Sequence, residues 1–266
     1  MKLSQVIDVL EKFGPLCYAE KWDNVGLLIE PTAVDVKKIL LTNDLTENVM
    51  KEAVEKQCNM IISYHPPIFQ GLKRITSSQW KERIVIGCLE NKIALYSPHT
   101  IWDAIENGTS EWLAESLPIS SIKPVISNLL NPNFGAGRVC EVNGPLTLRD
   151  AIEKIKVHTD VNDVRVAISY SGSLDSEIKT FGCCPGSGAS VLKEIKEPID
   201  LFITGEMSHH ELLDAVSNNK HVIMLNHSNS ERGYLKYFAP HLINLLKSPE
   251  IEILVSTVDT DPLKTV

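Results

Sequence analysis

Short apolar runs alternate with amphipathic segments along most of the chain. Runs that are rich in β-branched residues and bounded by turn residues predict buried strands. Near the N-terminus, Val6, Ile7, Leu10 and Phe13 recur at helical spacing opposite charged residues, which predicts an amphipathic helix. The predicted strands cover residues 37–44, 59–64, 92–97, 164–170, 178–184, 200–205, 221–226 and 251–256.

Amphipathic segments between these strands predict helices. Asp44 and Glu47 have the spacing of a capping box at the start of the first of them. Strands that alternate with helices imply α/β layers and largely parallel sheets. The predicted helices cover residues 47–57, 80–91, 110–117, 148–158, 188–195 and 209–219, and a long helix ends at Leu246.

Residues 118–145 interrupt this alternation. They are rich in Pro, Asn, Ser and Gly, as in PISSIKP and NLLNPNFGAG, which indicates a connector. The expected architecture is therefore α/β, with one domain over residues 1–125 and a second over residues 126–266. A chain of 266 residues is long enough for two such domains.

Composition and charge narrow the class of protein. The net charge of −8 gives an acidic surface, which disfavours bulk binding to nucleic acid. No apolar run approaches the roughly 18 residues that a membrane span requires. The six cysteines form no C-x-x-C pair, which predicts reduced and mostly buried thiols in the cytosol. The expected location is cytoplasmic, with the nucleus and the mitochondrion as alternatives, although Asp8 and Glu11 disfavour a mitochondrial presequence.

Histidines gather where predicted strands end. Five of the eight histidines follow a predicted strand: His65, His99, His209, His210 and His227. Ligands of open α/β sheets bind beyond the carboxyl ends of the strands. Imidazoles combined with carboxylates suit zinc, iron or manganese, and two such ions can share a bridging carboxylate and activate a water molecule. The clustering therefore predicts a site for divalent metal ions.

His65, His99 and Asp103 are the candidate ligands at the first two of these strand ends. Two prolines after His65 stiffen the chain there, and the alternative is a histidine that only hydrogen-bonds within its loop. His99 and Asp103 are four residues apart, so a helical turn would bring both to one face. Alternatively, Thr100 and Asp103 form a capping pair and His99 orients a ligand.

His227 and Glu231 repeat the four-residue spacing at a later strand end. The competing interpretation is a capping box formed by Ser228 and Glu231. A carboxylate that binds a metal could not also cap a helix well, so the two interpretations exclude each other.

Glu206, His209 and His210 are candidates for proton transfer. Ser208 and Glu211 fit a capping box, which places the two histidines in the first turn of a helix. The helix dipole lowers the pKa of a histidine at that position, and a neutral imidazole can transfer protons near pH 7. The alternative is a pair of surface histidines.

Two loops carry further candidate groups. Gly186, Ser187 and Gly188 join a strand to a helix, where exposed amides can hold an anion, although a tight turn is the default interpretation. In the turn from Trp22 onwards, Asp23 either faces the site or stabilises the turn itself.

Six ordered motifs resemble the Nif-three-like family, also described as the type-two GTP cyclohydrolase-like family of dinuclear metal proteins. The resemblance extends over nearly the whole chain. The motifs that carry it are WDNVGLL, SYHPPIF, SPHTIWD, the GSG at 186–188, TGEMSHHELL and NHSNSERG.

The resemblance implies a ligand set of His65, Asp103, His227 and Glu231, with Glu231 bridging two ions. Tyr64 stands where bacterial members have a histidine, as in the animal-like branch, and a tyrosine is a poor zinc ligand near neutral pH because its pKa is about 10. His99 then becomes a replacement ligand or an orienting group. The resemblance further implies two similar three-layer α/β domains with the metals in the cleft between them, and toroidal hexamers built from dimers.

Three functions follow from these expectations. The first is a hydrolase of a nucleotide-like or phosphorylated small molecule with two divalent ions per subunit, in which Glu206, His209 or His210 moves the proton and the 186–188 loop holds phosphate. The family description suggests GTP ring opening. The second function is an interaction partner of transcriptional co-regulators with a structural metal site. The third is a metal chaperone with exchangeable ligands.

Overall fold

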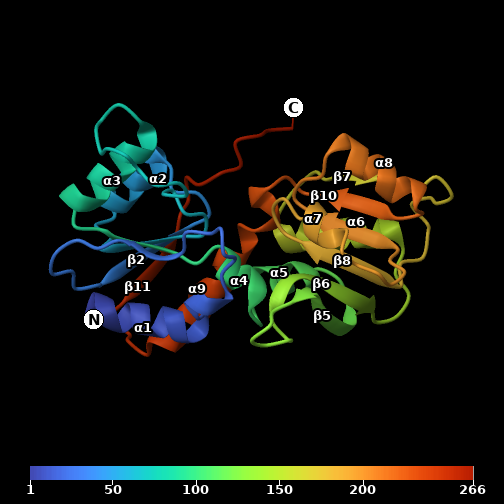
Figure 1. Cartoon of the computed structure of the whole chain (residues 1–266), viewed down its shortest axis with the longest axis horizontal. Coiled ribbons are helices and arrows are strands. Elements are labelled where there is room, and N and C mark those ends of the chain that lie inside the picture. The colour runs from blue at the N-terminus through green and yellow to red at the C-terminus, as the bar shows by residue number, and fades with distance from the viewer. Residues whose placement is uncertain (266) are drawn as a thin grey trace. The chain divides into compact units, whose positions relative to one another are not determined.

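The computed structural model describes residues 1–265 and divides the chain into two units (Figure 1). The N-terminal unit comprises residues 1–102 and 235–260, and the C-terminal unit comprises residues 103–234 and the end of the chain from Asp261. This division differs from the predicted boundary between residues 125 and 126. The physical reason is that the chain returns to the N-terminal unit near its end and adds a helix and a strand there.

The sheet of the N-terminal unit has five strands in the order β1-β4-β3-β2-β11. All neighbours are parallel except β1 and β4, which are antiparallel. Its central strands are buried apolar runs, as expected for a sheet covered on both faces. The strands are β1 (Gly26–Ile29), β2 (Lys38–Thr42), β3 (Met60–Ser63), β4 (Ala94–Ser97) and β11 (Glu252–Val255).

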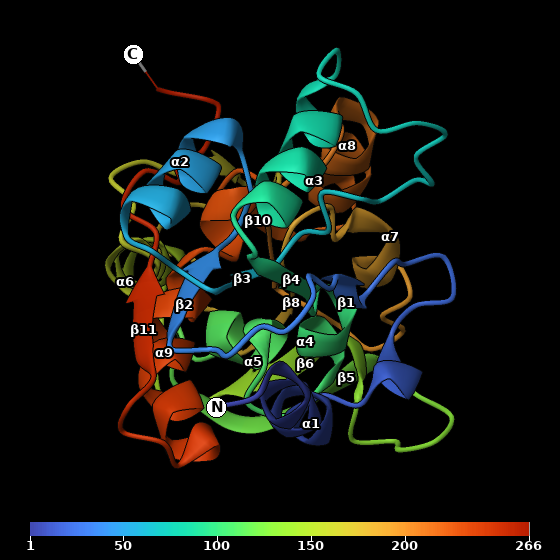
Figure 2. The same ribbon diagram turned by 90° about the vertical axis from the view of Figure 1, so that its left-hand side faces the viewer.

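Helices cover both faces of this sheet. In both views, α2 and α3 lie together on one face, and α1 and α9 lie on the other (Figures 1 and 2). The apolar side chains of Val49, Ile84 and Leu95 share one core cluster, which fixes the first pair of helices to the sheet. The bounds are α1 (Leu3–Phe13), the short 3-10 helix η1 (Leu16–Tyr18), α2 (Glu47–Glu55), α3 (Trp80–Glu90), α4 (Thr100–Ala104) and α9 (Gly233–Leu246).

The prediction that Asp44 caps the N-terminus of α2 is wrong. Thr46 is the N-cap, and its hydroxyl accepts a hydrogen bond of 3.4 Å from the backbone N–H of Val49. Asp44 lies two residues too early to cap, and its carboxylate contacts His65 instead.

The sheet of the C-terminal unit has six strands in the order β5-β6-β8-β9-β10-β7. The central strands β8, β9 and β10 are parallel, and the outer pairings are antiparallel. The α/β prediction is therefore confirmed. The strands are β5 (Ile119–Ser127), β6 (Gly135–Val142), β7 (Arg165–Ala167), β8 (Thr180–Cys184), β9 (Leu201–Thr204) and β10 (His221–Met224).

Helices also cover both faces of the second sheet. Val139 packs with apolar residues of α7 and α8, whereas its neighbour Arg138 points to the opposite face and contacts Glu111 of α5. Within residues 1–265, no helix is both long enough and apolar enough to cross a membrane. The bounds are α5 (Thr109–Ala114), α6 (Leu148–Thr159), α7 (Ala189–Leu192), α8 (His209–Ser217) and the 3-10 helix η2 (Ser228–Ser230).

The predicted connector at residues 118–145 is wrong, because most of it forms the hairpin of β5 and β6. Ile119 pairs with Val142 at one end of this antiparallel ladder and Ser127 pairs with Gly135 at the other. Strand β5 lies at the sheet edge, where Pro124 can sit without removing a hydrogen bond that a central strand would need. The polar composition therefore reflects an exposed edge strand.

The six cysteines are free thiols in the described chain. Cys58, Cys88, Cys140 and Cys183 are buried, Cys184 is partly buried and Cys17 is exposed. The prediction of mostly buried, unpaired thiols is confirmed.

Candidate metal centre

His65 follows β3 directly and is held by Asp44 at the end of β2. Its Nδ1 atom lies 2.9 Å from Asp44 Oδ1, and its backbone N–H donates to the carbonyl oxygen of Asn43. A ring that donates Nδ1–H to a carboxylate keeps the lone pair of Nε2 for another partner, as metal-binding histidines in proteins usually do. Asp44 was not predicted as an orienting group from the sequence. Its signal was the position at the tip of β2, next to β3 in the parallel sheet.

His99 follows β4 and is held by the buried carboxylate of Asp23. The Nδ1 atom of His99 lies 2.8 Å from Asp23 Oδ1, and the backbone N–H and the hydroxyl of Thr100 donate to Asp23 Oδ2. Burial alone would raise the pKa of Asp23, but the hydrogen bonds from His99 and Thr100 outweigh it and lower this pKa. Asp23, and not Asp103, therefore accepts the hydrogen bonds of Thr100 at the start of α4. The alternative of a Thr100–Asp103 capping pair is wrong.

Tyr64 is buried against the imidazoles of His65 and His99. Its ring centroid lies 5.1 Å from that of His65 and 5.8 Å from that of His99, and the centroids of the two imidazoles are 5.3 Å apart. Tyr64 thus supports the histidines as part of the core.

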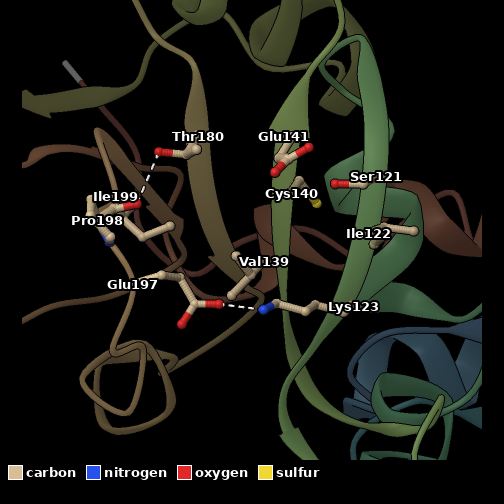
Figure 3. Close-up of a pocket in the computed structure, with 10 residues that line it drawn as sticks. All are labelled: Ser121, Ile122, Lys123, Val139, Cys140, Glu141, Thr180, Glu197, Pro198 and Ile199. Carbon is tan, nitrogen blue, oxygen red and sulfur yellow. Dashed lines mark hydrogen bonds and ion pairs between the residues drawn. The ribbon is translucent and has the colours of Figure 1, made fainter.

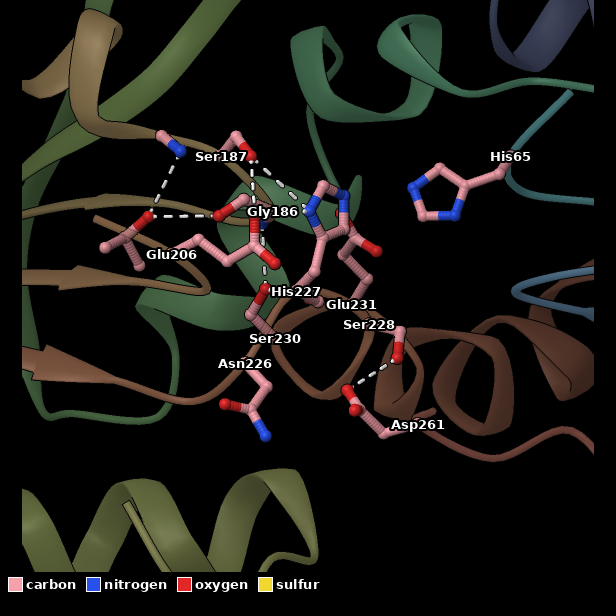
Figure 4. A network of polar contacts seen from close by, with 12 residues as sticks. His65, Gly186, Ser187, Glu206, Asn226, His227, Ser228, Ser230, Glu231 and Asp261 are labelled. Atoms are coloured by element: carbon pink, nitrogen blue, oxygen red, sulfur yellow. Dashed lines mark hydrogen bonds and ion pairs between the residues drawn. The ribbon is translucent and has the colours of Figure 1, made fainter. Parts of the chain in front are cut away.

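His227 and Glu231 face each other after β10 in the C-terminal unit (Figure 4). The Nε2 atom of His227 lies 3.5 Å from Glu231 Oε1, and its Nδ1 atom lies 3.3 Å from Glu206 Oε2. When Nδ1–H donates to Glu206, the lone pair of Nε2 points towards the carboxylate of Glu231. Two ligand atoms at 2.0–2.2 Å from one tetrahedral ion are about 3.3–3.6 Å apart, so the observed separation suits a shared metal ion.

The competing interpretation of Glu231 as a helix cap is wrong. The hydroxyl of Ser228 donates to Asp261 Oδ2 at 2.9 Å and accepts from Arg232, and η2 begins without a side-chain cap. The carboxylate of Glu231 is directed towards His227, and the residue is only 4% exposed.

Asp103 and Glu231 both belong to the C-terminal unit, and both carboxylates act on the thiol of Cys184, the last residue of β8. Burial raises the pKa of the Cys184 thiol well above its usual value, and the negative charges of Asp103 and Glu231 raise it further. Arg138 donates to the carbonyl oxygens of Ala104 and Ile105, which follow Asp103 in the chain. Three predicted ligands of this unit thus lie around the end of β8.

The loop of Gly186, Ser187 and Gly188 packs against these donors. The N–H of Gly186 donates to Ser230 Oγ and the N–H of Gly188 donates to Thr204 Oγ1. Gly186 has a φ of +62°, and a Cβ atom there would lie 2.6 Å from Glu231 Oε1 and 3.0 Å from His227 Nε2. Since both glycine amides donate within the protein, the loop mainly provides space for the donor atoms.

Glu206 contacts a candidate ligand, whereas His209 and His210 begin α8. The predicted capping box is confirmed, with Ser208 at the N-cap and Glu211 at the third helical position. The rings of His209 and His210 are exposed and lie 5.4 Å apart between centroids. The Ser187 hydroxyl donates to Glu206 at 3.0 Å, so Glu206 is held beside His227.

A separate pocket in the C-terminal unit contains none of the predicted site residues (Figure 3). It has a volume of about 420 Å³, and the ion pair between Lys123 and Glu197 lies at its wall. Its lining comes from β5, β6, β8 and the segment 197–199, so this pocket is distinct from the candidate donors.

The predicted ligands therefore fall into two groups. His65 and His99 belong to the N-terminal unit, and Asp103, His227 and Glu231 belong to the C-terminal unit. Within each unit an imidazole is oriented by a carboxylate.

Comparisons with known proteins identify the family. The family description Duf34/NIF3 (NGG1p interacting factor 3) matches residues 1–262. NIF3-like protein 1 of Drosophila melanogaster is 51% identical over 267 residues, which cover 100% of this chain and 89% of that protein. NGG1-interacting factor 3 of Saccharomyces cerevisiae is 36% identical over 280 residues and 96% of its length.

Solved structures agree with this assignment. The Bacillus cereus protein related to NIF3 matches with a TM-score of 0.90 at 20% identity, over 100% of this chain and 99% of that chain, which shows the shared fold. Reduced HcgD from Methanocaldococcus jannaschii matches with a TM-score of 0.80 at 26% identity, over 96% of this chain and 97% of that chain. The resemblance seen in the sequence motifs is confirmed, and this chain belongs to the Duf34/NIF3 family.

Proposed function

We propose that this chain is a divalent-metal-dependent hydrolase of a phosphorylated or nucleotide-like small molecule. The observation that carries the proposal is the 3.5 Å approach of His227 Nε2 to the buried Glu231 Oε1, with Glu206 on the other ring nitrogen. By resemblance to the family, the proposed ligands include His65, His227 and Glu231. The proposed set adds Asp103, with His99 as a further ligand or an orienting group.

The chemistry of these donors favours zinc, iron or manganese. Imidazole nitrogens and carboxylate oxygens suit these ions. Burial raises the pKa of the Cys183 and Cys184 thiols, which disfavours thiolate ligands there. A second ion that shares Glu231 is part of the proposal. Bound metal would supply Lewis acidity and lower the pKa of a coordinated water.

The protein's own groups then orient and move protons. Glu206 and the hydroxyl of Ser187 hold the imidazole of His227. Glu206 is half exposed, so its carboxylate can also exchange a proton with solvent or substrate. His209 and His210 are proposed as exposed relays at the start of α8.

Measurement of metal content and of phosphate-ester turnover, with and without chelator, tests this function. We expect chelator-sensitive turnover that is lost in Glu231→Gln and reduced in His209→Ala. Glu194→Gln is the matched control, because Glu194 forms an exposed ion pair with Lys196 on the surface. A fully metallated chain with no turnover of any nucleotide or sugar phosphate would contradict the proposal.

A second candidate function is binding to a protein partner. The yeast relative is named NGG1-interacting factor 3, and we propose that this chain likewise binds a transcriptional co-regulator, in the cytoplasm or the nucleus. The metal would then be structural. Partner capture that survives Asp103→Ala, in a chain without turnover, would support this function over the hydrolase.

Self-assembly from a dimer up to a hexamer is also part of the proposal, by resemblance to the family. Sedimentation velocity of the purified chain measures it. A single monomeric species at micromolar concentration would contradict it.

A further inference from the structure

Trp22 and Phe69 form an exposed aromatic pair in the N-terminal unit. Trp22 is 60% exposed and Phe69 is 43% exposed. Their ring centroids lie 6.0 Å apart with an interplanar angle of 59°, so the rings do not stack on each other. Large aromatic side chains usually bury most of their surface, and an exposed pair of them is often a recognition site.

The loop that presents Trp22 is fixed by the two residues that follow it. The carboxylate of Asp23 accepts from Thr100 and contacts the ring of His99. The Nδ2 atom of Asn24 donates to the carbonyl oxygen of Ile68 at 2.5 Å, which joins this loop to the one carrying Phe69. Trp22 is thus exposed in a loop that is held at several points, and a preorganised side chain loses little entropy when a ligand binds.

The aromatic pair lies beside the imidazoles of the candidate metal centre. The ring of His99 meets Trp22 edge-on at 6.0 Å and Phe69 edge-on at 6.5 Å between centroids. The same ring lies 5.3 Å from that of His65. Only the ring of His99 would therefore separate His65 from a ligand bound to the aromatic pair.

We propose that Trp22 and Phe69 bind the planar heteroaromatic ring of the substrate, such as a nucleobase. This inference rests on the proposed function, since it places a ring of the same substrate next to the metal ligands. Every base offers a flat π-face, and stacking on an aromatic side chain is tolerant of base identity.

The size of the patch argues against a protein partner at this position. Two aromatic side chains contribute at most about 500 Å² of contact surface. A stable protein interface buries about 800 Å² on each partner. A single planar ring matches the available surface better than a second copy of the chain does.

Calorimetric titration of the metal-loaded chain with AMP and with ribose 5-phosphate tests the proposal. The two probes share the phosphate and the sugar, and only AMP has a ring. We expect Trp22→Ala to weaken AMP binding by about 5- to 100-fold and to leave ribose 5-phosphate binding unchanged. Phe69→Ala should act in the same direction, and Trp22→Phe should restore most of the affinity for AMP.

Trp80→Ala is the matched control, because Trp80 is 42% exposed and lies outside the aromatic pair. It should change neither affinity. Equal affinity of the native chain for both probes, or AMP binding that Trp22→Ala does not alter, would overturn the inference. A change of assembly state in Trp22→Ala with unaltered AMP binding would do the same and assign the pair to a subunit contact.

The same titrations separate this inference from the proposed function. If the ring inference alone fails, ribose 5-phosphate still binds in a chelator-sensitive manner. If the metal function alone fails, chelation changes neither affinity, whereas Trp22→Ala still weakens AMP binding.

Discussion

The imidazole Nε2 of His227 and the carboxylate Oε1 of Glu231 lie 3.5 Å apart within one unit of the chain. Asn226, which precedes this histidine, has a left-handed backbone with φ of +69°. His99, at the end of β4, has a φ of +34°. Strained backbone at two strand ends is consistent with functional sites, where surrounding contacts hold residues in sparsely populated conformations.

Glu206 should control metal affinity through the orientation of His227. In Glu206→Gln the amide cannot accept from Nδ1–H as strongly as a carboxylate does, so we expect metal affinity to fall by about 10- to 100-fold. Competition with a fluorescent chelator measures this change. Glu194→Gln should retain the native affinity, and an unaltered affinity in Glu206→Gln would contradict the orienting role.

Gly186 should be required for metal binding for a steric reason. A Cβ atom at this position would meet both Glu231 and His227, so Gly186→Ala should abolish binding in addition to a backbone cost of about 1–2 kcal/mol. Gly144→Ala is the matched control, since Gly144 has a φ of +87° and, apart from its chain neighbours, none of the described residues lies within 4 Å of an added Cβ. Its metal affinity should stay native while its free energy of unfolding falls by a similar amount. Denaturation curves and metal titrations of both variants separate the two effects.

Glu52 should make the stability of the N-terminal unit depend on pH. Burial alone would raise its pKa, but hydrogen bonds from Lys56, Ser256 and Thr257 outweigh burial and lower the pKa to about 2 from an ordinary 4.5. A depressed carboxylate pKa stabilises the fold fully above pH 4.5, and the contribution is lost as pH falls from 4.5 towards 2.

The loss of unfolding free energy in Glu52→Gln should therefore be on the order of 3 kcal/mol near pH 7. This loss should shrink as the pH falls from 4.5 towards 2. Urea unfolding at several pH values measures it. Glu55→Gln, at an exposed position of the same helix, is the control. The difference in unfolding free energy between this variant and the native chain should not change with pH in this range. A pH-independent difference between Glu52→Gln and the native chain would contradict the account.

Arg138 should contribute strongly to the stability of the C-terminal unit. This fully buried guanidinium pairs with Glu111 and donates to the carbonyl oxygens of Gly135, Gly137, Ala104 and Ile105. Arg138→Met should cost about 3–5 kcal/mol, because it leaves several buried acceptors and a carboxylate uncompensated. Arg149→Met removes an exposed ion pair with Asp175 and should cost at most about 1 kcal/mol. Similar costs for the two variants in chemical denaturation would be inconsistent with this account.

The parts of the fold that sequence could predict are those with a strong local signal. The apolar strands 59–64 and 200–205 and the capping box of Ser208 and Glu211 all appear as predicted. The hairpin of residues 119–142 did not give such a signal, because an exposed edge strand has the polar composition of a connector. The return of the chain through α9 and β11 depends on tertiary packing, which local patterns do not encode.

The candidate site shows the same limit. Residues that follow strands could be found from sequence, and His65, His99 and His227 do lie at strand ends. The orienting carboxylates could not be paired with them, since Asp44 contacts His65 across neighbouring strands and Asp23 contacts His99 from a distant loop. Gly186 lacks a Cβ atom and so leaves room for Glu231 Oε1 and His227 Nε2. This depends on how the loop is positioned against them, which motif spacing does not give.

The most direct test is an anomalous difference map from crystals of the chain loaded with zinc or manganese, recorded at the absorption edge of the metal. The account predicts a peak about 2.0–2.2 Å from both His227 Nε2 and a carboxylate oxygen of Glu231, and its loss in Glu231→Gln. A loaded, folded crystal in which the ion binds elsewhere, with His227 and Glu231 free of it, would contradict the account.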